Sequence, residues 1–298
     1  MLDLQEKSFL KALRMLRIVT RRFFRGQKVG QRRSANKGAS VEFKDYKEYY
    51  PGDDPRFLDW NVFGRHDKLL VKVFHNEEDL QVYVMLDCSQ SMMHGSPSKF
   101  DHARKLAAAV SYLAATGMDR SRIVTFSNGL KEQSAFASRP GQVFNHFRFL
   151  EKAQVGGGSE LAKAVDEFML KHKRRGAVFL ISDFFTADAL EDTCRKLRYN
   201  KYEVFLVHVL ADDEIVPNLA GLYKLVDAED GTEREVYVDR EALEVYRQVL
   251  DEFTANLEKF ANTHGIIYTK APTSTPFEST IMSFFRGSKL ATPAGGKG

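Results

Sequence analysis

Short apolar runs alternate with longer amphipathic segments from residue 80 almost to the end of the chain. Runs of four to eight residues rich in Val, Ile, Leu and Phe are typical of buried strands, whereas apolar residues spaced three and four apart are typical of helices. The pattern predicts strands at residues 80–86, 122–127, 177–182, 203–210 and 266–270. It predicts helices at residues 99–116, 142–151, 160–173, 187–199, 240–263 and 277–285. This alternation predicts an α/β fold, with a doubly wound, mostly parallel sheet and helices on both of its faces.

Two further strand patterns and a tail complete this region. Residues 131–136 are expected to add a short antiparallel edge strand. Residues 222–226 and 233–238 flank Glu229-Asp230-Gly231, a combination that predicts an inserted β-hairpin before the long helix. Residues 287–298 are small, Gly-rich and Lys-tipped, so we expect a disordered tail there.

The first 38 residues are predicted to form a basic amphipathic helix and a linker. The helix is expected over residues 3–25, where the apolar positions are Leu2, Phe9, Leu13, Leu16 and Phe23. Arginines occupy the other side, and Gly26 and Gly30 are expected to end the helix. Such a helix either packs its apolar side on its own domain, which we favour, or lies on an anionic membrane or a partner.

Residues 39–78 form a separate segment with strand patterns at residues 41–43 and 69–74. A charged tract lies between them and contains Pro51-Gly52, which is turn punctuation. Its acidic residues could be catalytic. We favour the interpretation that Asp53, Asp54, Arg56, Asp59 and Arg65 form an ion-paired, capped loop around Trp60, the single tryptophan of the chain.

Composition narrows the class of protein. The chain has 298 residues, 43% of them apolar, and no apolar run reaches the roughly 18 residues that a membrane-spanning helix needs. Two cysteines give neither a disulfide framework nor a zinc set, so we expect a cytoplasmic protein. The net charge of +4 is uneven, because residues 1–37 hold eleven Lys or Arg and two acidic residues.

Oxygen-bearing side chains follow three of the predicted elements. Asp87, Ser89 and Ser91 form a D-x-S-x-S tract directly after the strand at 80–86. Ser159 follows a run of three glycines, and Asp183 follows the strand at 177–182. Ligands of open α/β sheets bind at the carboxyl ends of strands, and hard divalent cations take oxygen ligands. A divalent-metal site is therefore predicted, with helix caps and ordinary turns as the alternative.

These three loops resemble the metal-ion-dependent adhesion site of von Willebrand factor A (vWA) domains. The resemblance implies a vWA-like, Rossmann-like domain over residues 79–286 that binds Mg²⁺ or Mn²⁺, with Ca²⁺ as a further candidate. Ser159 stands where Thr is usual, which keeps the hydroxyl.

The tract before this domain is similar to that of a bacterial family called domain of unknown function 58. Tyr-x-Pro-Gly-Asp-Asp-Pro-Arg, then Asp-Trp, Gly-Arg and Leu-x-Val-Lys-x-Phe carry the resemblance, which covers residues 35–285. It assigns the family motif to Gly52, Asp53, Asp54, Arg56, Asp59, Trp60 and Arg65. It also implies a MoxR-type AAA+ ATPase partner in chaperone-like protein maturation.

Three function classes remain open. The favoured one is a metal-dependent protein-interaction module without enzyme activity, which binds the ATPase or a client protein through an acidic residue. The favoured class follows partly from the absence of a phosphate-binding loop, a Ser-His-Asp order and a Cys/His metal set. The second class is a metal-dependent phosphoesterase or nuclease that uses His94. The third is nucleic-acid or membrane-surface binding through the basic N-terminus, which would place the protein at the periphery of the inner membrane.

Overall fold

The computed structural model describes residues 4, 6–28, 42–75, 80–117, 119–185, 189–227 and 231–290. Contacts divide the chain into two units. The first, Met1–Phe23 with Leu80–Gly298, is called the α/β unit, and the second, Phe24–Asp79, is called the motif unit. The predicted linker at residues 29–38 and the final residues of the predicted tail, 291–298, lie outside the described residues.

The α/β unit is built on a six-stranded sheet. Its strands are β3 (Gln81–Asp87), β4 (Arg120–Ser127), β5 (Gly129–Gln133), β6 (Gly176–Ser182), β7 (Glu203–Leu210) and β10 (Ile267–Pro272). They lie in the order β10-β7-β6-β3-β4-β5, with all pairs parallel except the antiparallel pair β4 and β5. The predicted doubly wound fold is thus confirmed. The chain winds in opposite directions from β3 and β6, so the switch point where ligands bind in such sheets lies between these two strands.

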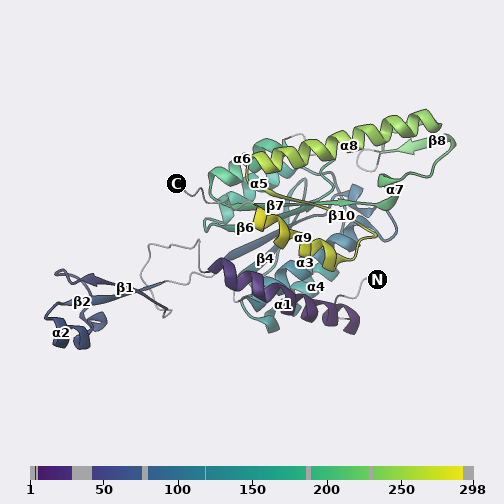
Figure 1. The fold of residues 1–298 in the computed structure, drawn as a ribbon. Helices are drawn as coiled ribbons and strands as arrows, with labels where there is room; N and C mark the ends of the chain where they lie inside the picture. Colours follow the sequence, from purple (N-terminus) through teal and green to yellow (C-terminus); the bar gives the residue numbers. More distant parts are fainter. Residues whose placement is uncertain are drawn as a thin grey trace. The chain divides into compact units, whose positions relative to one another are not determined.

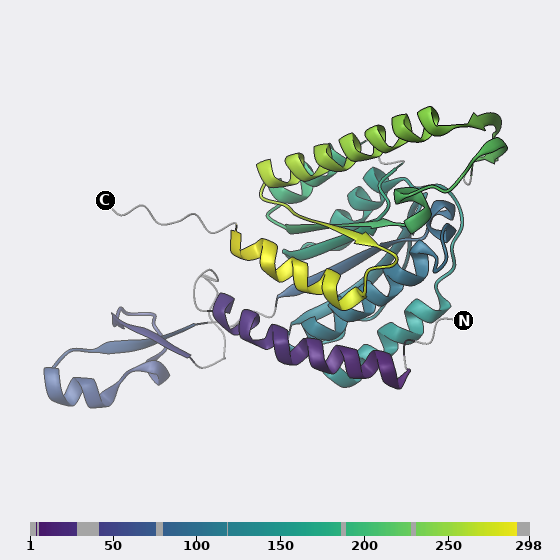
Figure 2. The same ribbon diagram turned by 45° about the vertical axis from the view of Figure 1, so that its right-hand side comes forward.

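Helices cover both faces of this sheet, as Figures 1 and 2 show. One face carries α3 (Lys99–Thr116), α4 (Val143–Lys152) and α9 (Phe277–Leu290), and the other carries α5 (Leu161–Lys171), α6 (Leu190–Tyr199) and α8 (Arg240–Thr263). All seven residues of β3 are buried, because a central parallel strand has helices on both sides. Tyr83 and Met85 belong to the core under α5, α6 and α8.

Side-chain caps start two of these helices. The Ser98 hydroxyl accepts a hydrogen bond from the Asp101 backbone N–H and caps α3. Asp239 caps α8 in the same manner through the Ala242 N–H. The inserted hairpin is present as β8 (Gly221–Val226) and β9 (Glu233–Val238). A short helix, α7 (Asp212–Ile215), was not predicted.

The predicted C-terminal ends of two helices were wrong. α9 continues to Leu290, four residues into the predicted tail, and α1 (Lys7–Lys28) continues past Gly26. A single glycine costs a helix only about 1 kcal/mol relative to alanine. Neighbouring turns can offset that cost, so a glycine alone does not end a helix.

The N-terminal helix packs on the α/β unit. Leu4, Phe9, Leu13 and Leu16 are buried, and the Phe9 ring lies 4.9 Å from the Phe277 ring of α9. The Phe147 ring of α4 is 6.2 Å away from the Phe9 ring. The apolar side of α1 therefore faces its own domain, which is the arrangement that we favoured over membrane contact.

The motif unit is a small antiparallel pair with a long connection. β1 (Glu42–Glu48) pairs with β2 (Leu70–His75), and the connection holds a 3₁₀ turn at Pro55–Phe57 and the helix α2 (Trp60–His66). Within the described ranges, no helix of either unit combines the length and the apolar character needed to cross a bilayer.

Removal of the α1 contact should destabilise the protein. Leu13 is fully buried, so Leu13→Ala should lower the free energy of unfolding by about 2–5 kcal/mol through lost burial and a cavity. Urea unfolding of the full chain measures this change. Met15, 59% exposed on the same helix, is the matched control, and Met15→Ala should stay within about 0.5 kcal/mol of the parent. Equal unfolding midpoints for the two variants would refute the packing of α1 on the domain.

Candidate metal centre

The predicted ligands lie where β3 and β6 end side by side. Leu86 pairs with Ile181, so Asp87 and Ser182 to Asp183 follow at the same edge of the sheet. The glycine loop joins them, because the Gln90 N–H donates to the Gly157 carbonyl at 2.9 Å and the Gly156 N–H donates to the Cys88 carbonyl at 2.9 Å. These backbone bonds bring Ser159 to the D-x-S-x-S loop.

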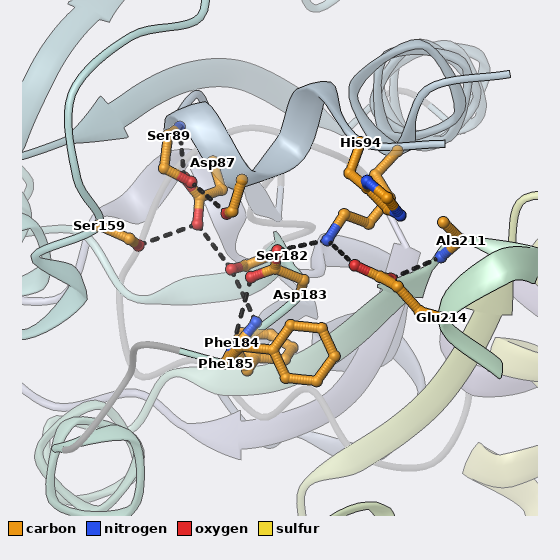
Figure 3. Close-up of polar contacts among 12 residues, drawn as sticks. Asp87, Ser89, His94, Ser159, Ser182, Asp183, Phe184, Phe185, Ala211 and Glu214 are labelled. Carbon is orange, nitrogen blue, oxygen red and sulfur yellow. Dashed lines mark hydrogen bonds and ion pairs between the residues drawn. The ribbon is translucent and has the colours of Figure 1, made fainter. Parts of the chain in front are cut away.

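Asp87 is the centre of the polar contacts at this edge (Figure 3). Its Oδ1 accepts the Ser89 backbone N–H at 2.8 Å, and its Oδ2 accepts the hydroxyls of Ser159 at 3.0 Å and Ser182 at 2.6 Å. The Ser89 and Ser91 hydroxyl oxygens are 3.1 Å apart. Four of the five predicted ligands are therefore brought together.

Two opposing effects act on the Asp87 carboxyl group. Complete burial raises its pKa, and the negative charge of Asp183 acts in the same direction. The hydrogen bonds from Ser182 and Ser89 act against this rise because they stabilise the ionised form. A divalent cation at this edge would supply the positive charge that the hydroxyls cannot supply.

Asp183, the fifth predicted ligand, has a cationic partner that we did not anticipate. The Lys99 Nζ lies 2.7 Å from Asp183 Oδ2 and 2.5 Å from Glu214 Oε1. Lys99 and Asp183 are each 1% exposed. The carboxylate of Asp183 thus lies at the predicted edge, where it accepts hydrogen bonds from Lys99 and from the Phe185 N–H of the following loop.

Three residues of this region were missed in the sequence. Ser182 directly precedes Asp183 and could have been included, since it ends the same strand. Lys99 stands one position after the α3 cap, on a helix whose buried side includes Ala103 and Leu106, so its place on the apolar side was a usable signal. Glu214 lies on α7, 115 residues beyond Lys99, and no local sequence pattern predicts the ion pair between them.

The donor set fits a hard cation. Two carboxylates and three hydroxyls offer oxygen alone, which suits Mg²⁺, Mn²⁺ or Ca²⁺ and not zinc. Among the residues that the structure describes, no three His, Cys, Asp or Glu side chains gather as a metal set. A cation here would consequently depend on Ser89, Ser91 and Ser159 as well as on Asp87.

His94 lies outside this cluster. Its Nε2 is 3.0 Å from Asp213 Oδ2, and both side chains are more than half exposed. The contact links the loop after β3 to α7, and it places the imidazole at the surface.

The family motif of the motif unit is a network of internal ion pairs. Asp53 binds Lys47 at 2.6 Å, and Asp54 binds the Arg56 guanidinium at 2.6 Å while its Oδ1 accepts the Arg56 N–H. The carboxylate of Asp59 caps α2 and contacts Lys72 at 2.9 Å.

Lys72 and Tyr46 lower the pKa of the Asp59 carboxyl group. Trp60 is 65% exposed, so the expectation that the loop closes around it was wrong. The ion-paired side chains of the motif lie on the strands and the loop, whereas the Trp60 indole lies on the exposed side of α2.

Replacement of Lys99 should lower the stability of the folded protein. Lys99→Met would leave the buried carboxylate of Asp183 beside Glu214 without a counter-charge, which typically destabilises a protein by about 3–5 kcal/mol. Thermal and urea unfolding measure this loss. Lys163, whose ion pair with Glu160 is exposed, serves as the control, and Lys163→Met should change the free energy of unfolding by about 0–1 kcal/mol. Equal losses in both variants would contradict the assigned role of Lys99.

Solved structures similar to this chain share little sequence identity with it. One is a conserved hypothetical protein BatB from Bacteroides thetaiotaomicron, 13% identical, with a TM-score of 0.47 over 70% of this chain and 99% of that one. Another is the SpRpn10 VWA domain, 12% identical, with a TM-score of 0.39 over 69% of this chain and 94% of that one.

Sequence relatives cover more of the chain. The uncharacterized protein Rv1480 of Mycobacterium tuberculosis (strain ATCC 25618 / H37Rv) is 27% identical over 244 residues, which are 80% of this chain and 76% of the relative. Residues 45–255 match the family described as protein of unknown function DUF58. This match includes the ion-paired motif and the three loops around Asp87, and the chain belongs to the DUF58 family.

Proposed function

We propose that the α/β unit is a divalent-cation-dependent protein-interaction module. The observation that carries the proposal is the convergence of Ser89, Ser91 and Ser159 on the buried carboxylate of Asp87. Mg²⁺ typically takes one or two carboxylates and keeps several waters. A cation held by Asp87 and hydroxyls would retain positive charge and exchangeable positions, and these can accept a carboxylate from another protein.

The proposal assigns no catalytic residue. Metal-assisted hydrolysis needs a base or nucleophile near the ion, and His94 pairs with Asp213 at the surface. A two-metal centre would need several free carboxylates, but Asp183 and Glu214 already share Lys99. Phosphoesterase activity is therefore the less supported function. The cytoplasmic location expected from the cysteine content belongs to the same proposal.

The proposed partner is an acidic group on another protein. The family resemblance implies a MoxR-type AAA+ ATPase, a client protein or both, and a role in chaperone-like maturation. The net positive charge of the bound cation would attract a Glu or Asp of that partner, and one displaced water would leave a coordination position for it.

Direct metal binding is the first test. Calorimetry with Mn²⁺ and Mg²⁺ should give one site in the parent and none in Asp87→Asn, which keeps the size of the side chain but removes its charge. Ser159→Ala should weaken binding on the order of tenfold, equivalent to about 1.4 kcal/mol. Asp166→Asn is the control, because that carboxylate is exposed on α5 and pairs with Lys196, and it should bind like the parent.

Circular dichroism and thermal unfolding should show that each variant is folded. Undiminished Mn²⁺ binding by folded Asp87→Asn would reject the site.

Partner binding is the second test. A MoxR-type ATPase should co-purify with the full chain in Mg²⁺ or Mn²⁺ and should be released by EDTA, because chelation removes the charge that holds the partner's carboxylate. Asp87→Asn should behave as the parent does in EDTA, while Asp166→Asn retains the partner. Recovery of the ATPase in EDTA, or with Asp87→Asn, that equals recovery with the parent in Mg²⁺ would show that another surface makes the contact.

A further inference from the structure

A buried lysine lies beside the candidate metal centre. Lys99 is the first residue of α3, and its side chain is 1% exposed. Neither circumstance favours an ammonium group, because the first turn of a helix prefers negative charge and burial removes the hydration of a cation. The Phe185 ring, whose centroid is 5.3 Å from the Lys99 Nζ, replaces only a small part of that hydration. Lys99 therefore depends on carboxylates to offset these costs.

Two carboxylates from different elements hold the ammonium group (Figure 3). Asp183 Oδ2, after β6, is 2.7 Å from the Lys99 Nζ, and Glu214 Oε1, on α7, is 2.5 Å from it. The Asp183 side chain is 1% exposed, and the Glu214 side chain is 14% exposed. One ammonium group thus has two carboxylate partners, and it keeps one of them if the other is engaged elsewhere.

Glu214 is held in place by contacts that do not involve Lys99. Its Oε2 accepts the Ala211 backbone N–H at 2.8 Å, and its carbonyl accepts the Tyr246 hydroxyl at 2.9 Å. The loop after β3 packs closely on the same turn, because a Cβ at Gly95 would lie 2.8 Å from the Ala211 Cβ. Glu214 is consequently a fixed partner for the ammonium group.

Asp183 is the partner that a cation would also use. Its neighbour Ser182 donates to Asp87 Oδ2 at 2.6 Å. Burial raises the pKa of the Asp87 carboxyl group, and the negative charge of Asp183 raises it further, so the two carboxylates are close enough to interact. Asp183 Oδ2 accepts from Lys99, and its Oδ1 accepts the Phe185 N–H at 3.4 Å. Coordination by Asp183 would therefore weaken or displace its ion pair with Lys99.

We infer that Lys99 competes with the divalent cation for Asp183 and thereby sets the affinity of the candidate metal centre. The inference rests on the proposed function, because it concerns the same site. Removal of both partners from a buried charge is strongly destabilising. Glu214 prevents this by keeping the ammonium group paired when Asp183 turns to the cation. Lys99 thus makes cation binding weaker and more easily reversed than two free carboxylates would.

The first test removes the competing charge. Calorimetry with Mn²⁺ on the full chain should show at least about tenfold tighter binding by Lys99→Met, because Asp183 then has no counter-charge of its own. Lys99→Met with Asp183→Asn should lose this gain. Lys131→Met is the control, since the exposed Lys131 ammonium group donates to the Gly156 carbonyl of the glycine loop at 2.8 Å. It removes the same charge near the site, and its affinity should stay within about threefold of the parent, because solvent screens exposed charges.

A second variant carries the test if Lys99→Met does not fold. Glu214→Gln leaves Asp183 as the one carboxylate in the ion pair with Lys99 and should strengthen that pair. Mn²⁺ binding should then weaken by about fivefold or more, because the ammonium group can no longer release Asp183 without losing its charged partner. Asp213→Asn is the matched control, since it removes one negative charge from the same helix, where Asp213 pairs with the exposed His94. It should bind Mn²⁺ like the parent.

Several results would overturn the inference. One is equal Mn²⁺ affinity of the parent and folded Lys99→Met. Another is an equal gain when Lys99→Met is combined with Asp183→Asn, or in Lys131→Met, because the change in net charge would then explain the tighter binding. Undiminished binding by Glu214→Gln, or a matching loss in Asp213→Asn, would also contradict it. Circular dichroism should show that each variant compared is folded.

The parent protein separates this inference from the proposed function. If the parent binds Mn²⁺ and Lys99→Met binds it no more tightly, the inference fails and the metal site stands. If the parent does not bind Mn²⁺ but Lys99→Met does, the proposed cation-dependent function fails, and Lys99 is the group that keeps the cation out. Absence of Mn²⁺ binding in the parent and in every folded variant would reject both.

Discussion

The arrangement of the three loops around Asp87 depends on one constraint, which is the burial of the Asp87 carboxylate. An ionised group at the carboxyl end of a central strand loses its hydration, and this loss is costly unless hydrogen bonds or charges replace the water. Here the replacement comes from the Ser89 N–H and from the hydroxyls of Ser159 and Ser182. Three loops that are far apart in the sequence thus meet because one carboxylate needs donors from each of them.

The second buried carboxylate at this edge is stabilised in a different way. Asp183 shares the ammonium group of Lys99 with Glu214, and this contact connects β6, α3 and α7. Asp87 is surrounded by neutral donors, whereas Asp183 has a full positive charge beside it. The two carboxylates are therefore not equivalent, although the sequence motif presents both as ligands.

The fold was largely predictable because its signals are local. The buried runs of β3, β6 and β7 and the cap at Ser98 can be read within a few residues. The Lys99–Glu214 contact could not be predicted, since it joins residues 115 positions apart and α7 is a single turn. The exposure of Trp60 was missed because a tryptophan in a charged loop suggests burial, and nothing in the spacing shows on which side of α2 it lies.

Lys99 bears on how tightly a cation can bind beside it. The Lys99 ammonium group lies 2.7 Å from the Asp183 carboxylate. A divalent ion that also bound this carboxylate would lie close to the ammonium group, and the two positive charges would repel each other. The ion would gain less from Asp183 than from a carboxylate without a partner, so Asp87 and the hydroxyls would supply most of its binding. A cation at such a site would be held weakly and would keep positive charge, which would favour the proposed reversible contact with a carboxylate of another protein.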